Sequence, residues 1–148
     1  DHAVYYLCIL LGSFVLMLPL VIRWRGSADL LVKILPAIAV MVVGFLVLAW
    51  SPTLMLFVMA LLVFFVGFNY LEATLPALVS KVAPSARRGS AMGVYSSSQF
   101  LGIFAGGSVG GVLIGLTDIT TLLVVNAALL ILWAGLLMAL QRGSNQPK

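Results

Sequence analysis

The sequence predicts an all-α membrane protein of five transmembrane helices, and two observations support that prediction. Hydrophobic residues make up 63% of the 148 positions, whereas only 8% of the residues are charged. A soluble domain carries roughly 25% charged residues to coat its surface. The apolar residues also form five long runs, and about 20 such residues suffice to cross a bilayer. Because lipid offers the backbone no hydrogen-bond partners, each run is expected to be a helix.

Short segments with charges, prolines and small polar residues separate the five runs. The predicted helices cover residues 3–22, 30–50, 53–80, 89–116 and 119–140. The excess of apolar residues excludes a disordered chain. A disulfide-stapled module is excluded too, because Cys8 is the only cysteine. The chain starts at Asp1, with no leader-like segment before the first run, so we expect it to begin inside a longer polypeptide.

The basic residues predict the orientation of the helices. All of them fall in or beside the first connection, the third connection and the C-terminal tail; they are Arg23, Arg25, Lys33, Lys81, Arg87, Arg88, Arg142 and Lys148. Since basic loops stay in the cytoplasm, the N-terminus is expected outside and the C-terminus inside. The net charge of +4 does not indicate nucleic-acid binding, because these residues follow the membrane topology and form no patch with aromatic residues.

Polar residues inside the runs divide the predicted helices into two kinds. The first, third and fourth contain several polar side chains or glycines, so they need protein or water on one side. The second and fifth are almost wholly apolar, and such helices face lipid or an apolar core. We therefore expect Gly44, in the second helix, to face lipid and to tolerate larger residues better than Gly106 or Gly110.

Glu72 is the only ionisable residue deep inside a predicted span. It lies nine residues before Lys81, about 13 Å from the end of its helix. A carboxylate at that depth must be protonated, paired or facing water. Asn69, three residues earlier, lies on the same helix face. This pair is either a substrate or proton site, or a packing contact in which Glu72 bonds a neighbouring helix.

The fourth run carries two further signals. Its glycines are spaced so that two helix backbones could approach closely, and we expect a helix interface at Gly93, Gly102, Gly106, Gly107, Gly110 and Gly111. Polar groups surround one turn of the same run, and they line a cavity or bond neighbouring helices; they are Ser96, Ser97 and Gln99.

The residues needed for most enzymes are missing from the sequence. No cluster of cysteine, histidine and acidic residues has the spacing of a metal site. The single histidine, His2, lies at the extreme N-terminus, and no second acid lies near Glu72 to form a catalytic dyad. No phosphate-binding glycine loop is present. We therefore expect neither an enzyme nor a bound cofactor.

The glycines of the fourth run also resemble a known motif. Gly93, Gly102, Gly106-Gly107 and Gly110-Gly111 repeat the antiporter motif G-x8-G-x3-G-P-x2-G-G of the major facilitator superfamily, with Gly107 in place of its proline. Residues 64–76, which read FFVGFNYLEATLP, resemble the tenth helix of drug:proton antiporters of that superfamily.

This resemblance implies that the five helices are helices eight to twelve of a twelve-helix transporter, an incomplete C-terminal six-helix half. It implies a multi-pass protein of the bacterial inner membrane that exports a small molecule, coupled to protons, by alternating access. The missing N-terminal half of the transporter is then its partner. The alternative is a non-transporting membrane subunit or scaffold that binds a partner through its glycine-rich helix.

Overall fold

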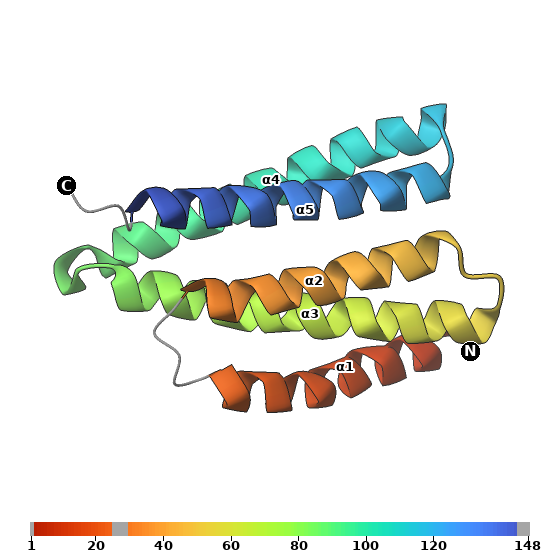
Figure 1. Ribbon diagram of the computed structural model, residues 1–148, viewed down its shortest axis with the longest axis horizontal. Helices are drawn as coiled ribbons and strands as arrows, with labels where there is room; N and C mark the ends of the chain where they lie inside the picture. The colour runs from red at the N-terminus through yellow and green to blue at the C-terminus, as the bar shows by residue number, and fades with distance from the viewer. Residues whose placement is uncertain (1, 25–29, 145–148) are drawn as a thin grey trace.

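The computed structural model describes residues 2–24 and 30–144, and it contains no strand among them. Five α-helices follow one another, with one short 3-10 helix before the fourth (Figure 1). Their bounds are α1 (His2–Trp24), α2 (Leu30–Ala49), α3 (Leu54–Val82), η1 (Ser85–Arg87), α4 (Arg88–Leu116) and α5 (Ile119–Ser144). The predicted all-α class with five helices is confirmed.

Successive helices run in opposite directions, so the connections alternate between two ends of the molecule (Figure 1). Lys33 lies in the first turn of α2, and Lys81 and Arg142 lie in the last turns of α3 and α5. These basic residues therefore share one end, together with the start of α4, whereas Asp118 lies at the other end. The assignment of the basic end to the cytoplasm remains a prediction.

Local interactions explain where two of the helices begin. The side chain of Thr53 accepts a hydrogen bond from the backbone amide of Leu56 at 3.3 Å and caps α3. Asp118 does the same for α5, because its Oδ1 accepts from the amide of Thr121 at 2.7 Å. Such caps satisfy amides that have no partner within the helix.

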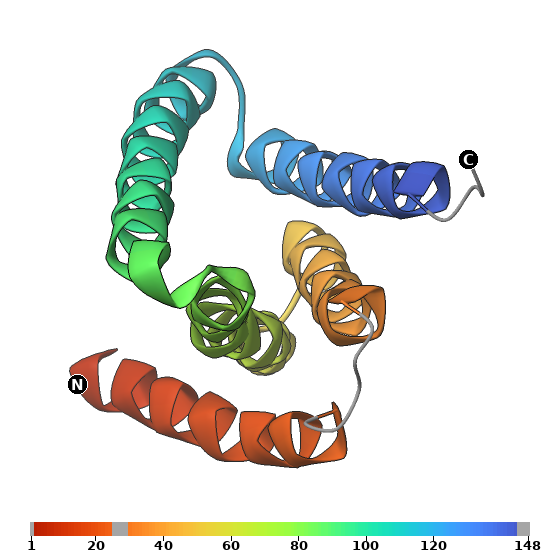
Figure 2. The same cartoon turned by 90° about the vertical axis from the view of Figure 1, so that its left-hand side faces the viewer.

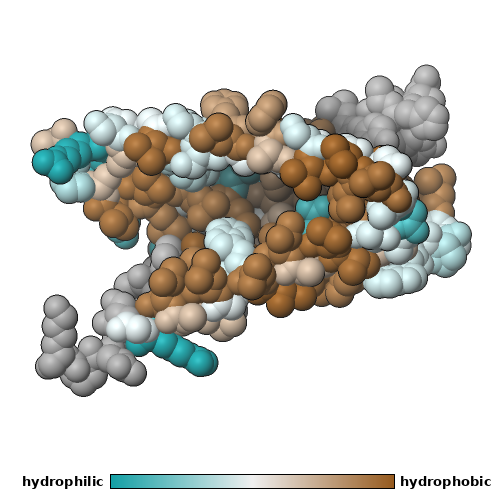
Figure 3. Space-filling view, turned by 90° about the horizontal axis from the view of Figure 1, so that it is seen from above, coloured by the Kyte–Doolittle hydropathy of each residue, from teal (hydrophilic) through white to brown (hydrophobic). Residues whose placement is uncertain are grey.

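Among the described residues, four helices, α2 to α5, are long and apolar enough to cross a membrane. The face seen in Figure 3 is mainly hydrophobic, and strongly hydrophilic residues gather mostly towards its ends. This distribution suits a molecule with lipid around its middle and water at both ends.

The helices α2 and α3 form the centre of the molecule, with α1 against α3 and α5 against α2 (Figure 2). The core is built from one cluster of buried side chains: Met17, Ile34, Ala37, Ile38, Met41, Tyr70 and Leu71. By contrast, α4 has no buried residue. The apolar helix α2 thus lies in the core of this chain, and the more polar α4 lies at its edge.

The expectation that Gly44 faces lipid is wrong. Gly44 is buried, and a Cβ atom built on it would lie 2.8 Å from the Cβ of Phe64 in α3. On the facing helix, a Cβ on Gly67 would lie 2.7 Å from the carbonyl oxygen of Ala37. Each helix therefore supplies one glycine where the two backbones meet. In lipid, close approach of this kind stabilises helix pairs through van der Waals contact.

The glycines of α4 have open space within this chain. A Cβ added at Gly93, Gly102, Gly106, Gly107 or Gly111 would meet nothing within 4 Å. At Gly110 it would meet only the Cδ1 atom of Leu122, at an ordinary contact distance of 3.7 Å. The described residues thus provide no close partner for these glycines, and an interface with another half remains a prediction.

Candidate functional site

The middle of α3 carries two side chains that bond to two different helices. Asn69 Nδ2 donates a hydrogen bond to Ser13 Oγ of α1 at 2.9 Å. One turn further along α3, Glu72 Oε1 accepts a hydrogen bond from Gln99 Nε2 of α4 at 2.8 Å. Successive residues of a helix are about 100° apart, so positions i and i+3 differ by roughly 60° around the axis. That angle allows α3 to contact α1 with one side chain and α4 with the other.

The contact between Asn69 and Ser13 is buried on the serine side. Ser13 is fully buried, at 0% exposure, and its hydroxyl also donates to the carbonyl oxygen of Leu10 at 2.8 Å. The hydroxyl thus serves as donor and acceptor at once, which a serine can do. Asn69 is half-buried, so its hydrogen bond reaches from the partly open side of α3 to a buried serine and fixes α1 against α3.

The contact between Glu72 and Gln99 is more open. Glu72 is exposed and Gln99 is only half-buried. Glu72 is also the only acidic residue within the five described helices. It is therefore a titratable group at mid-span with one hydrogen-bond partner and room for others. An intramembrane acid in this setting is a candidate for proton or substrate binding.

The structure separates the residues that the sequence grouped together. Asn69 and Glu72 share a turn of α3, but each bonds a different helix. In α4, Gln99 bonds a neighbouring helix, whereas Ser96 is half-buried and Ser97 is exposed. Ser13 belongs to no motif in the sequence, and its position inside an apolar run is the one signal there that marks it as a site residue.

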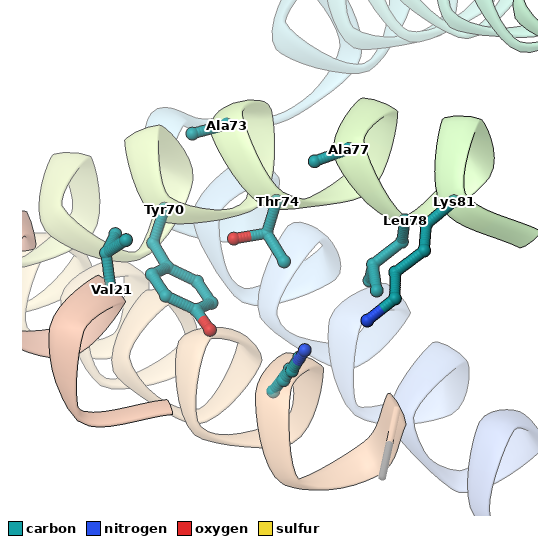
Figure 4. Close-up of a pocket in the computed structure, with 8 residues that line it drawn as sticks. Val21, Tyr70, Ala73, Thr74, Ala77, Leu78 and Lys81 are labelled. Atoms are coloured by element: carbon teal, nitrogen blue, oxygen red, sulfur yellow. The ribbon is translucent and has the colours of Figure 1, made fainter. Parts of the chain in front are cut away.

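A second polar feature lies at the basic end of the molecule. A cavity of about 270 Å³ opens between α1, α2 and α3. It is lined by polar side chains and apolar walls, among them Lys33, Lys81, Tyr70, Thr74, Val21 and Leu78. Figure 4 shows Tyr70, Thr74, Leu78 and Lys81 pointing from α3 towards the same space. In the sequence, both lysines indicate only the topology, and no motif around them points to this cavity.

Metal ligands do not gather in the part of the chain that the structure describes. Within residues 2–24 and 30–144 there is no group of three or more histidine, cysteine and acidic side chains that could hold a metal ion. The groups that the mid-span site contains are a carboxyl group, amides and hydroxyls. These groups can bind a proton or a polar substrate by hydrogen bonds.

Comparison with known proteins relates the chain to membrane transporters. No family model matches it. It is similar to the inner membrane transport protein YajR of Escherichia coli (strain K12), with 36% identity over 135 residues, which cover 90% of this chain and 30% of that protein. It is also similar to uncharacterized transporters of Buchnera aphidicola, from the subspecies Baizongia pistaciae (38% identity, 51% of this chain, 19% of the relative) and Acyrthosiphon pisum (42%, 40% and 15%). The chain thus spans less than a third of the length of each relative.

Proposed function

The chain is related to the inner membrane transporter YajR, and from that premise we propose that it is part of a secondary transporter of the major facilitator superfamily. In this proposal, α1 to α5 are helices eight to twelve, and an N-terminal half completes the substrate site. The reaction is efflux of a small organic molecule in exchange for protons, by rocking of two halves around a site at the bilayer midplane.

The hydrogen bond between Glu72 and Gln99 is the observation that supports proton coupling. It joins the only acid of the described helices to α4, the helix with no buried residue. Because α4 has few other attachments, its position depends strongly on what happens at this bond. A change in the protonation of Glu72 is thus coupled to the placement of a whole helix.

Gln99 can partner both protonation states of Glu72. Its amide NH2 donates to the carboxylate in the arrangement observed. When the carboxyl group is protonated, its O–H can donate to the amide oxygen once the amide turns over. Either state thus keeps one hydrogen bond between the two side chains at mid-span, where an isolated polar group would be costly in a low-dielectric medium. Proton exchange therefore keeps the link between α3 and α4, and it acts on α4 through the turn of the amide and the altered geometry of the bond.

The contact between Asn69 and Ser13 has a different role in this proposal. It is buried at Ser13 and involves no titratable group. It holds α1 and α3 together while the carboxyl group of Glu72 gains and loses its proton. The part of the site that changes with the protonation of Glu72 is therefore the side of α3 that faces α4.

The test compares two acid-to-amide substitutions in the complete transporter, reconstituted in vesicles with an imposed pH gradient. Glu72→Gln keeps the size of the side chain and its hydrogen-bonding ability but cannot titrate. Asp118→Asn makes the same chemical change at an exposed position outside the spans. We expect Glu72→Gln to stop gradient-driven flux and Asp118→Asn to retain it, with equal amounts of folded protein.

Normal transport by Glu72→Gln across a pH series would show that the coupling role is wrong and leave Glu72 as a packing contact. A wild-type protein that carries no substrate under any gradient, but retains a membrane partner through purification, would instead support the scaffold alternative.

A further inference from the structure

The cavity at the basic end has a composition that suits an anion. Two lysine side chains from different helices line it, Lys33 from α2 and Lys81 from α3, and none of its lining residues is acidic. Two ammonium groups that share one cavity repel each other, and an anion between them relieves that repulsion. The hydroxyl groups of Tyr70 and Thr74 add polar contacts on the same wall.

The size and position of the cavity narrow the kind of anion. Its volume of about 270 Å³ lies just below the roughly 300–1,000 Å³ of typical small-molecule sites, so it suits a headgroup-sized ligand. Both lysines lie in terminal turns at the same end of the helices, the level at which lipid headgroups meet the protein. The remaining walls include Val21, Leu78 and Ala77, and these apolar surfaces suit the start of an acyl chain.

We propose that this cavity binds the phosphate-bearing headgroup of an anionic phospholipid, held by Lys33 and Lys81. Basic pockets between transmembrane helices at one membrane surface bind such headgroups in other proteins. A free phosphate ion has the same charge chemistry but gains nothing from the apolar walls. The bound lipid thus contacts α1, α2 and α3 together at the basic end of the molecule, next to the core cluster. This proposal does not depend on what the protein transports.

The experiment titrates the full chain, purified in detergent, with phosphatidylglycerol and with phosphatidylcholine of the same acyl chains, and counts bound lipid by native mass spectrometry. We expect phosphatidylglycerol to bind at least about tenfold more tightly. Near a membrane surface one lysine contributes about a fivefold change in anionic-lipid affinity. Lys33→Gln with Lys81→Gln should therefore weaken phosphatidylglycerol binding about thirtyfold and leave phosphatidylcholine binding unchanged.

Two controls separate a cavity from general attraction to a basic surface. Arg142→Gln removes a positive charge at the same end but outside the cavity lining, and it should leave lipid binding unchanged. Ala77→Leu adds bulk at the cavity lining without changing any charge, and it should weaken binding. Ala139→Leu, at an exposed position of α5 outside the lining, should not. Because these are mild changes on helices, the folded fraction can be matched by size-exclusion chromatography.

Several results would overturn the proposal. Equal affinity for the two lipids is one, and an effect of Arg142→Gln as large as that of the lysine pair is another. Inorganic phosphate that displaces phosphatidylglycerol at similar concentration would assign the cavity to a soluble anion instead.

Discussion

Replacing Gly44 with alanine should destabilise the chain, whereas the same replacement at Gly106 should not. The new Cβ at Gly44 would lie 2.8 Å from the Cβ of Phe64 and 2.9 Å from its Cα and its backbone nitrogen. Two of these atoms belong to the backbone and the third is attached to it, so no side-chain rotation can relieve the overlap. The helices α2 and α3 must move apart instead.

The size of the effect follows from opposing contributions. Overpacking of a tight contact costs about 1–3 kcal/mol, and separating the helices by about 0.5–1 Å forfeits a quarter to a half of the local dispersion energy. Alanine in place of glycine recovers about 0.5–1 kcal/mol of helix stability. At Gly106, where the added atom meets nothing within 4 Å, only that gain remains. We therefore expect the two variants to differ by about 2 kcal/mol.

The assay is reversible unfolding in mixed micelles with increasing SDS, followed by circular dichroism. Gly67→Ala should behave like Gly44→Ala, because its new Cβ would lie 2.7 Å from the carbonyl oxygen of Ala37. Adding Phe64→Ala to Gly44→Ala should give no rescue, since alanine keeps the Cβ and the backbone that cause the overlap. Equal stability of Gly44→Ala and Gly106→Ala, or full rescue by Phe64→Ala, would refute this account of the α2–α3 contact.

Two further predictions concern hydrogen bonds. Ser13→Ala removes the buried acceptor between α1 and α3, and it should lower the free energy of unfolding by about 0.6–1.7 kcal/mol in the same SDS titration. An unchanged free energy of unfolding would show that this hydrogen bond does not stabilise the helix pair. Hydrogen bonds from Thr121 hold the pKa of Asp118 below its usual range. Because the pKa is lowered in the folded state, the ionised Asp118 stabilises the fold. That stabilisation is fully present above the ordinary aspartate pKa of about 3.9, and it is lost as the pH falls through the lower folded value. An NMR titration of Asp118 should show that lowered pKa, and Thr121→Pro, which removes both the hydroxyl donor and the backbone donor of Thr121, should raise it.

The helices could be predicted from the sequence because each apolar run ends at a charge, a proline or a capping residue. Ser51-Pro52 and the cap at Thr53 separate α2 from α3, and Asp118 separates α4 from α5. These signals are local, so they do not depend on how the helices pack. The alternation of basic and non-basic ends is equally local, and it agrees with the antiparallel order in Figure 1.

The partners of the candidate residues could not be predicted in the same way. Asn69 bonds a residue 56 positions away, and Glu72 bonds one 27 positions away. Which side chains meet across such distances depends on the rotation and tilt of each helix, and those follow from packing with neighbours. The sequence therefore placed Asn69 and Glu72 on one face of α3 but left open the partners that divide them.

The buried position of α2 shows why polarity was a poor guide to burial here. Lipid is as apolar as a leucine side chain, so an apolar helix gains little by leaving lipid, and close contacts and polar bonds decide which helices meet. One glycine on each of α2 and α3 provides such a contact, and two isolated glycines form no visible repeat. In α4 the glycine repeat is visible, yet these residues meet almost nothing within the chain. A helix held mainly by its connections and by the bond to Glu72 gains more than any other helix here from a second protein surface, and we expect that surface to be the other half of a transporter.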